Sequence, residues 1–285
     1  MPIVILTDSA SDIDASERQS LGIVAVPLKI MFGAETYVDA VTISSSEFFD
    51  KLKQSSVMPT TSQPSPLEFA EAYKAIYEQY GKDVQIIAIL LSGSLSGTYQ
   101  SAMIAKSMLD ENIDITVIDS RKASFVHGMI CVEAAKAAQA GKNKEQILDQ
   151  IDRYLDEVQV YFIVDTLEFL QKGGRIGKAS AVIGSLLNIK PILTLDAAGY
   201  VSAFDKVRGT KKALNRVFEA LQEYAQGEPV KIAMLHSSVP DQAAELLERL
   251  KQEFSVTDSW LEQIGPVIGT HTGPGLLGFV MVKDK

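Results

Sequence analysis

Two short segments gather hydroxyl groups beside predicted helix starts, where they could bind an anion. Thr60-Thr61-Ser62-Gln63 precedes a helix predicted to begin at Ser65. A second segment, at 92–97, lies between a predicted strand and a predicted helix. Free N–H groups at a helix start and small hydroxyls together form a neutral pocket for an anion. The same residue types are common in helix caps and turns, and spacing alone leaves both interpretations open.

Other polar residues stand after strands or beside glycines. Asp8 and Asp12 follow the first predicted strand, where Asp12 is well explained as a helix N-cap. Arg175 follows two glycines, a pattern equally expected of a helix C-cap with a solvated arginine. His271 lies in a segment of glycine and proline that we predict to be a tight loop. A loop histidine is either an exposed residue or part of a site.

Two catalytic motifs are matched only in part. The segment 93–97 has the spacing of a nucleophile elbow, but its central residue is Leu95 rather than serine. The segment 172–179 departs from a phosphate-binding loop at both ends, because Lys172 replaces the first glycine and Ala179 replaces the hydroxyl residue. The histidines show no metal-ligand spacing; they are His127, His236 and His271. Metal catalysis and a serine hydrolase of this type are therefore disfavoured.

Composition narrows the class of protein further. The 36 acidic residues exceed the 27 basic ones, and the net charge of −9 argues against a nucleic-acid partner. Cys131 is the single cysteine, which excludes an internal disulfide and a cysteine-rich zinc site. No apolar run approaches the roughly 18 residues of a membrane helix, and the N-terminus lacks the basic region of a signal peptide. We expect a cytoplasmic protein without a metal or cofactor.

Short apolar runs alternate with amphipathic stretches, which is typical of an α/β fold. In the first half, strands are predicted over 3–7, 23–30, 84–91 and 113–119, with a hairpin extension to 38. Helices between them imply a mostly parallel sheet. In the second half, strands are predicted over 158–164, 190–195, 201–207, 230–236 and 278–282, with a small-residue helix near 181–187. We predict two α/β domains, 1–157 with a mostly parallel sheet and 158–285 with a mixed or antiparallel sheet.

Five short motifs occur along the chain in an order that indicates a family. They are Thr7-Asp8-Ser9, Thr61-Ser62-Gln63-Pro64, Leu95-Ser96-Gly97-Thr98-Tyr99-Gln100-Ser101-Ala102, Gly173-Gly174-Arg175 and His271-Thr272-Gly273-Pro274-Gly275. In this combination the chain resembles, over essentially its whole length, the DegV family of fatty-acid-binding proteins. That family includes the binding subunit of bacterial fatty acid kinase. The resemblance implies an acyl chain buried between the two domains, with its carboxylate held by loop hydroxyls.

The resemblance also implies roles for individual residues. Thr61 would donate a hydrogen bond to the carboxylate, with help from His271 and from the loop at 92–94. Arg175 would lie at the pocket mouth or contact a partner. No residue is assigned a catalytic role. The full set predicted to bind the fatty acid is Thr61, Ser62, Ser92, Gly93, Ser94, His271 and Thr272.

One position departs from the family pattern. Two adjacent serines commonly precede the Leu-Ser-Gly-Thr run, whereas this chain has Ser92-Gly93. If the second serine normally binds the carboxylate, Gly93 offers only its N–H. Ser92 or Ser94 would then have to replace the missing hydroxyl.

The function that the resemblance implies is that of a lipid carrier. The protein would hold a long-chain fatty acid such as palmitate, stearate or oleate and present it to a separate ATP-dependent fatty acid kinase subunit, which would form the acyl phosphate. Transient membrane contact fits this role. Burying about 15 methylenes at ~0.8 kcal/mol each supplies at most about 12 kcal/mol before the costs of association. Two alternatives remain: a lipid-sensing regulatory protein, and an acyl hydrolase with His271 as base.

Overall fold

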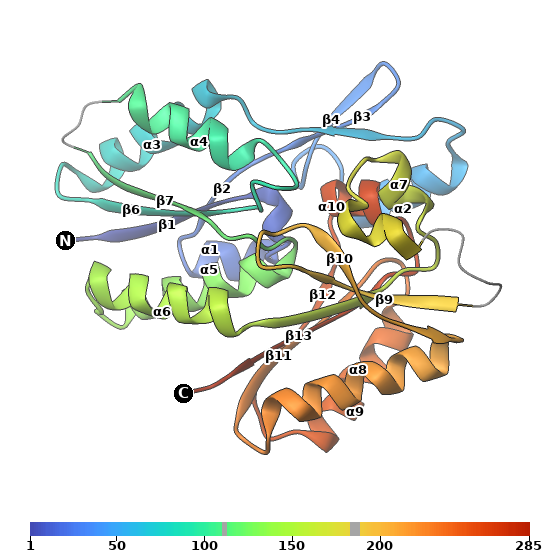
Figure 1. The fold of residues 1–285 in the computed structure, drawn as a ribbon. Coiled ribbons are helices and arrows are strands. Elements are labelled where there is room, and N and C mark those ends of the chain that lie inside the picture. Colours follow the sequence, from blue (N-terminus) through green and yellow to red (C-terminus); the bar gives the residue numbers. More distant parts are fainter. Residues whose placement is uncertain (110–112, 183–188) are drawn as a thin grey trace.

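The first half of the chain forms a parallel four-stranded sheet in the order β2-β1-β6-β7. The computed structural model describes residues 1–109, 113–182 and 189–285. The strands of this sheet are β1 (Ile3–Asp8), β2 (Val24–Val26), β6 (Gln85–Leu90) and β7 (Asp114–Asp119). Helices α3 (Pro66–Tyr80) and α4 (Thr98–Ser107) cover one face, as Figure 1 shows. The prediction of a mostly parallel sheet in this half is confirmed.

The second half forms a mixed six-stranded sheet in the order β10-β9-β8-β13-β11-β12. Only the β11–β12 pair is parallel among the described strand pairs of this sheet. The strands are β8 (Gln159–Ile163), β9 (Ile189–Leu195), β10 (Val201–Arg208), β11 (Val230–His236), β12 (Val256–Gln263) and β13 (Leu277–Lys283). Helices α8 (Thr210–Ala225) and α9 (Pro240–Glu253) cover its outer face. The predicted α/β class and mixed second sheet are therefore confirmed.

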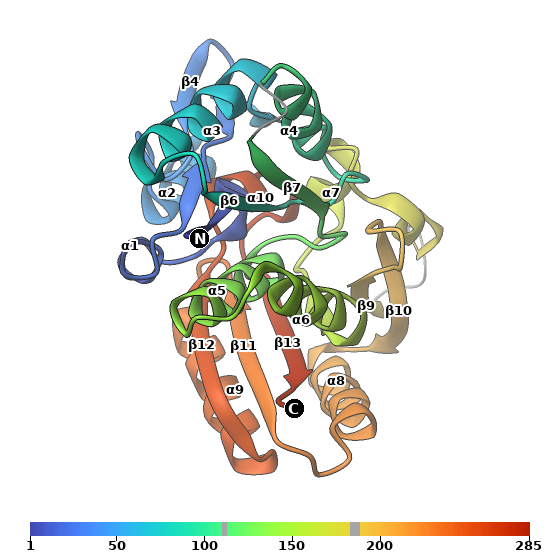
Figure 2. The ribbon, with the colours of Figure 1, turned by 90° about the vertical axis from the view of Figure 1, so that its left-hand side faces the viewer.

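Two helices lie between the sheets and join them into one core. Figure 2 shows α5 (Phe125–Gln139) and α6 (Lys144–Glu157) between the strands of the first sheet and those of the second. Helix α5 is buried on nearly every side, from Phe125 to Ala137. A helix that is apolar all round needs cover on both faces, and the two sheets provide it. Side chains of both sheets and both helices share one hydrophobic cluster.

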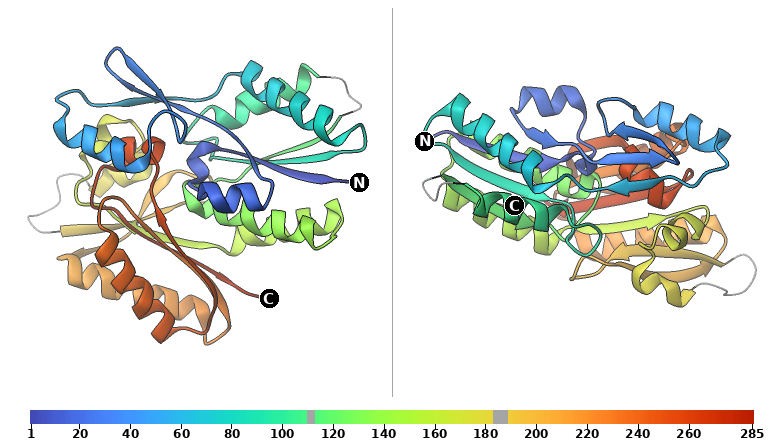
Figure 3. Two further views of the ribbon diagram at one scale, coloured as in Figure 1. Left: turned by 180° about the vertical axis from the view of Figure 1, so that it is seen from behind. Right: turned by 90° about the horizontal axis from the view of Figure 1, so that it is seen from above.

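A small third sheet stands beside the first and receives a helix from the far end of the chain. It has the order β4-β3-β5, formed by β3 (Lys29–Phe32), β4 (Glu35–Val38) and β5 (Thr60–Ser62). Helix α10 (Pro266–Thr272) packs against β3, β5 and α2 (Ser45–Gln54). Figure 3 shows α10 close to α2 when the molecule is seen from behind. The shorter elements are η1 (Ser9–Ser11), α1 (Ala15–Ser20), α7 (Glu168–Lys172) and η2 (Gly177–Val182).

Two local predictions are corrected by the structure. The single strand predicted over 23–30 is divided into β2 and β3, which belong to different sheets. Pro27 separates them because proline has no N–H for a sheet ladder, and the next amide, Leu28 N, donates to Ser9 Oγ at 3.0 Å instead. His271 and Thr272 belong to the last turn of α10 rather than to a loop. Pro266, at the start of α10, is a favourable first helical residue.

Other predictions are not settled in the same way. The edge strand β12 and the short helix α7 were not predicted. The helix predicted near 181–187 lies largely outside the described residues, since the structure describes nothing over 183–188. The domain boundary between 157 and 158 stays a prediction. Within the described part of the chain, each helix is too short or too polar to cross a lipid bilayer.

An ion cluster around the buried Glu133 ties α5 to the second sheet. Glu133 is 5% exposed and accepts hydrogen bonds from the ammonium groups of Lys231 and Lys136 and from the hydroxyl of Tyr154. Lys136 also pairs with Asp258 on β12 at 3.2 Å. A buried charge keeps its place only when partners replace its water. The cluster therefore fixes how α5 sits on the sheet.

We predict that Glu133→Ala lowers the free energy of unfolding by about 3 kcal/mol, because Lys231 is left buried without its main partner. The measurement is urea unfolding followed by circular dichroism. Glu133→Ala combined with Lys231→Met removes both charges and should recover most of the loss. Equal destabilisation in the single and double variants would show that the ion pair itself is not the cause.

Candidate functional site

A cavity opens where the carboxyl ends of β1 and β6 face α10 and the inner face of the second sheet. It encloses about 890 Å³, counting its opening to solvent. In open α/β sheets, this edge of parallel strands is the usual place for a ligand. Asp8 is buried here and ties the two strand ends together, because it accepts from Ala10 N at 3.0 Å and Leu91 N at 2.7 Å. Asp8 thus has a structural part in shaping the cavity rim.

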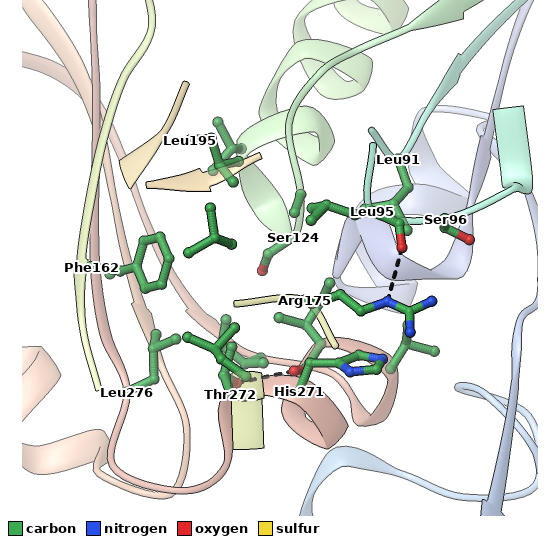
Figure 4. A pocket seen from close by; sticks show the side chains of 18 of the residues that line it. Leu91, Leu95, Ser96, Ser124, Phe162, Arg175, Leu195, His271, Thr272 and Leu276 are labelled. Atoms are coloured by element: carbon green, nitrogen blue, oxygen red, sulfur yellow. Dashed lines mark hydrogen bonds between the residues drawn. The ribbon is translucent and has the colours of Figure 1, made fainter. Parts of the chain in front are cut away.

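One end of the cavity is apolar. Figure 4 shows Phe162, Leu195 and Leu276 grouped on the side away from His271 and Arg175. Phe162 lies on β8 and Leu195 on the neighbouring strand β9. Further apolar lining comes from the neighbouring strands and loops, namely Val160, Val201, Leu235 and Ile264. Such a surface offers a place for hydrocarbon and no partner for a charge.

The other end carries a hydrogen-bonded pair. Thr61 Oγ1 and His271 Nε2 are 2.9 Å apart, although the two residues are separated by 210 positions in sequence. Strand β5 brings Thr61 to the cavity, and the last turn of α10 brings His271. Burial, with a smaller effect of the nearby positive Arg175, lowers the pKa of His271 to about 4. The imidazole is therefore neutral at physiological pH.

The first of the two glycines before Arg175, Gly173, packs against His271. A Cβ on Gly173 would lie 2.3 Å from His271 Nδ1, so any larger residue would displace the ring. The Arg175 side chain is exposed at the opening, where its Nε donates to Leu95 O at 3.1 Å and its Nη1 donates to Gly173 O at 2.8 Å. These bonds hold the guanidinium beside the neutral histidine, as Figure 4 shows for Leu95.

The loop at 92–94 does not line the cavity. It forms hydrogen bonds to the turn between β9 and β10 instead. Ser92 Oγ donates to Gly199 O at 3.1 Å, and Ser94 Oγ donates to Ala198 O at 2.7 Å. Gly93 N donates to Asp119 Oδ1 at 3.1 Å. Each group would have to exchange its present bond before it could bind a carboxylate. Their role there stays a prediction.

Position 93 also has a steric reason to be glycine. A Cβ at Gly93 would lie 2.8 Å from the Asp119 carboxylate. In its present position, Asp119 therefore leaves no room for a serine side chain at position 93, where the family commonly has one. The structure accounts for Gly93 locally, through this contact and through its N–H bond to the same side chain.

Of the other two residues predicted to bind the fatty acid, Thr272 lines the cavity and Ser62 does not. Ser62 is outside the cavity lining, and its hydroxyl lies 3.3 Å from Gln63 O. Alternate residues of a strand point to opposite faces, and Thr61 takes the cavity side. Thr272 does line the cavity, but its hydroxyl donates to Ile268 O at 3.0 Å. The proton of its hydroxyl is therefore already used within α10.

Two hydroxyl residues that line the cavity were not predicted from the sequence, namely Ser96 and Ser124. Ser96 belongs to the Leu-Ser-Gly-Thr run, so the sequence signal that could have found it is that motif. Ser124 gives no sequence signal, because it adopts a left-handed φ of 56° just before α5 and depends on the fold for its place. Among the described residues, no three acidic, histidine or cysteine side chains converge to hold a metal ion.

Comparison with known proteins identifies the family of the chain. The family profile described as "Uncharacterised protein, DegV family" matches residues 2–284. The chain belongs to the DegV family. Protein DegV of Bacillus subtilis is 37% identical over 281 residues, which is 98% of each chain. A DegV domain-containing protein of Halalkalibacterium halodurans is 38% identical over 284 residues, 99% of each chain.

Solved structures of DegV proteins share the whole architecture. The chain has a TM-score of 0.91 and 36% identity with a DegV family protein of Thermus thermophilus, covering 100% of both chains; that structure is described as fatty acid binding. The same TM-score, identity and coverage hold for DegV of Bacillus subtilis, described as a fatty acid binding protein. The predicted family and two-sheet architecture are therefore confirmed.

We predict that His271 stays neutral on acidification well below the usual histidine range. Its imidazole resonances in ¹H–¹³C NMR spectra should change little from pH 8 down to 5 and titrate near pH 4. Arg175→Ala should raise this pKa, because it removes a nearby positive charge, yet leave it below 6.5 because burial is the larger cause. A midpoint near 6.5 in the parent protein would mean that the ring is solvated.

Proposed function

We propose that this protein binds a long-chain fatty acid, with the carboxylate at the Thr61–His271 end and the acyl chain along the apolar end. The observation that supports the proposal is a single cavity that is polar at one end and hydrocarbon-like at the other. An amphipathic ligand with one small anionic head matches both ends. Two DegV relatives with 36% identity are described as fatty acid binding, which supports the same ligand class.

The protonation of the pair decides how it can receive a carboxylate. If His271 carries its proton on Nε2, it donates to Thr61 Oγ1, and the threonine O–H is then free to donate onward. Among the described residues, Nδ1 of His271 has no hydrogen-bond partner, so none of their carboxylates competes for the ring. A bound carboxylate would accept a hydrogen bond from the Thr61 hydroxyl, with the exposed Arg175 farther out at the opening. Donors of this kind offset the several kcal/mol that burying the head group costs.

The position of the head group supports the role of a carrier for a kinase. Arg175 is exposed at the cavity opening, so the carboxylate end faces the side from which a second protein could reach it. A separate ATP-dependent kinase subunit would then phosphorylate the carboxylate of the bound acid. The hydrolase alternative gains no support, because a catalytic histidine is normally oriented through its second nitrogen, and no described residue pairs with Nδ1 of His271.

Thr61→Val tests the head-group assignment. The substitution keeps the shape of the side chain but removes a donor to a charged group, worth about 1.5–3 kcal/mol. We expect affinity for oleate to fall roughly 10- to 150-fold, measured by displacement of a fluorescent fatty acid. Ser62→Ala, the adjacent hydroxyl outside the lining, is the control and should bind as the parent does. Unchanged affinity in Thr61→Val would place the carboxylate elsewhere.

Arg175→Ala separates holding the lipid from passing it on. The Arg175 side chain lies at the opening, so its loss should change oleate affinity less than threefold while slowing acyl phosphate formation by the cognate kinase more than tenfold. His271→Ala should weaken both, because it removes the partner of Thr61. Lys172→Ala, a nearby exposed charge, is the control. Loss of oleate binding in Arg175→Ala with normal phosphorylation of the remaining complex would reverse these roles.

A further inference from the structure

A second cavity lies beside the lipid cavity and is strongly acidic. It is bounded by the segment 9–18, the loop 39–47 and the chain at 262–266, and it encloses about 1320 Å³ including its mouth. The two cavities share a wall at Asp12 and Ser124. Ser124, which lines the lipid cavity, donates to Asp12 Oδ2 at 2.5 Å, and Asp12 lines the acidic one.

Carboxyl groups from three separate segments face this second cavity. They are Asp12 after η1, Asp39 after β4 and Glu262 on β12. Among the described residues, none of the three forms an ion pair. Arg18 also borders the cavity and is its one lining cation among the described residues. It lowers the pKa of Asp39 electrostatically without pairing with it.

Asp39 is the most unusual of these groups. It is 1% exposed, and neither of its carboxylate oxygens has a hydrogen-bond partner in the described part of the structure. The Ser9 hydroxyl and the Ala40 N–H face Asp39 and lower its pKa by favouring the charged carboxylate. Neither group meets the distance and angle of a hydrogen bond to it. An orphaned buried carboxyl group costs stability unless something else satisfies it. Since Asp39 borders the cavity, a ligand there could provide the missing donors.

The shape of the site selects the kind of cation. No three acidic, histidine or cysteine side chains among the described residues approach closely enough to enclose a metal ion. The carboxyl groups instead line a broad space that also has apolar walls, including Ile13 and Val41. Val41 is 70% exposed at the mouth, where an aliphatic stem could cover it. A long side chain or diamine buries its methylenes while its charged head reaches the carboxylates.

We propose that the acidic cavity binds an extended organic cation, a primary amine or guanidinium carried on an aliphatic stem. The head would donate to Asp39 and lie near Asp12 and Glu262, and the stem would run along Val41. A free diamine and a lysine or arginine side chain presented by another protein share this chemistry. Comparing a diamine with a lysine peptide distinguishes the two sources.

The proposal makes binding depend on pH in a defined direction. Burial, with added repulsion from neighbouring carboxylates, raises the pKa of Asp39 to about 7 and of Glu262 to about 8. Both must ionise to bind a cation, so affinity should increase as the pH rises from 6 to 8. The titratable and charged groups that face this cluster, from all three segments, are Asp8, Asp12, Asp14, Glu17, Arg18, Asp39, Glu47 and Glu262.

Isothermal titration with 1,5-diaminopentane tests the site directly. We expect saturable binding of one equivalent that is several-fold tighter at pH 8 than at pH 6, while the neutral 1,5-pentanediol does not bind. Asp39→Asn should weaken diamine binding at least tenfold. Glu71→Gln, which neutralises an exposed glutamate on α3, removes the same charge elsewhere and should have no effect.

A second variant and a peptide arm complete the design. Glu262→Gln, on a different segment, should also weaken binding, and thermal unfolding of both variants establishes that they fold. Binding of an end-blocked Ala-Lys-Ala peptide with affinity similar to the diamine identifies a partner's side chain as the natural source, and binding of the diamine alone identifies a free cation. No saturable binding by the parent protein, or equal binding by Asp39→Asn and Glu71→Gln, overturns the proposal.

Discussion

The hydrogen bond between Thr61 and His271 is the contact on which the rest of the site depends. It joins a short strand of the first half to a short helix of the second half, across 210 positions of sequence. Neither element would be stable alone: β5 has three residues and α10 has seven. Their packing against α2 and β3 supplies the missing support, and Gly173 leaves the space that the ring needs. Together these contacts create the polar end of the cavity.

The core between the sheets explains why the cavity can be both deep and stable. Helix α5 is enclosed by the two sheets, and Glu133 fixes it to the second one through buried charges. The strands of the second sheet then present Phe162, Leu195 and Leu235 toward the cavity. The serine loop at 92–94 closes one side of this arrangement, because it holds the turn that connects the strands of Leu195 and Val201. The cavity and the junction between the two halves thus use the same surfaces.

The sequence was most informative where local rules decide the structure. Capping boxes at Ser44 and Ser65, the alternation of strands and helices, and the hairpin over 190–207 could all be predicted because each depends on neighbouring residues. The motif order correctly indicated the family and brought Thr61, His271 and Arg175 into view. It could not show that α10 crosses to the first half, because that contact depends on surfaces far apart in the chain. For the same reason the apolar lining, the place of Ser124 and the acidic wall at Asp39 required coordinates.

The most direct test of the account is a crystal structure of the protein with a fatty acid brominated at its terminal carbon, whose anomalous signal marks the tail. The account predicts one carboxylate oxygen within hydrogen-bond distance of Thr61 Oγ1 and the bromine among Phe162, Leu195 and Leu276. A bromine signal beside His271, with the carboxylate at the opposite end, would contradict it. So would a fatty acid bound outside this cavity.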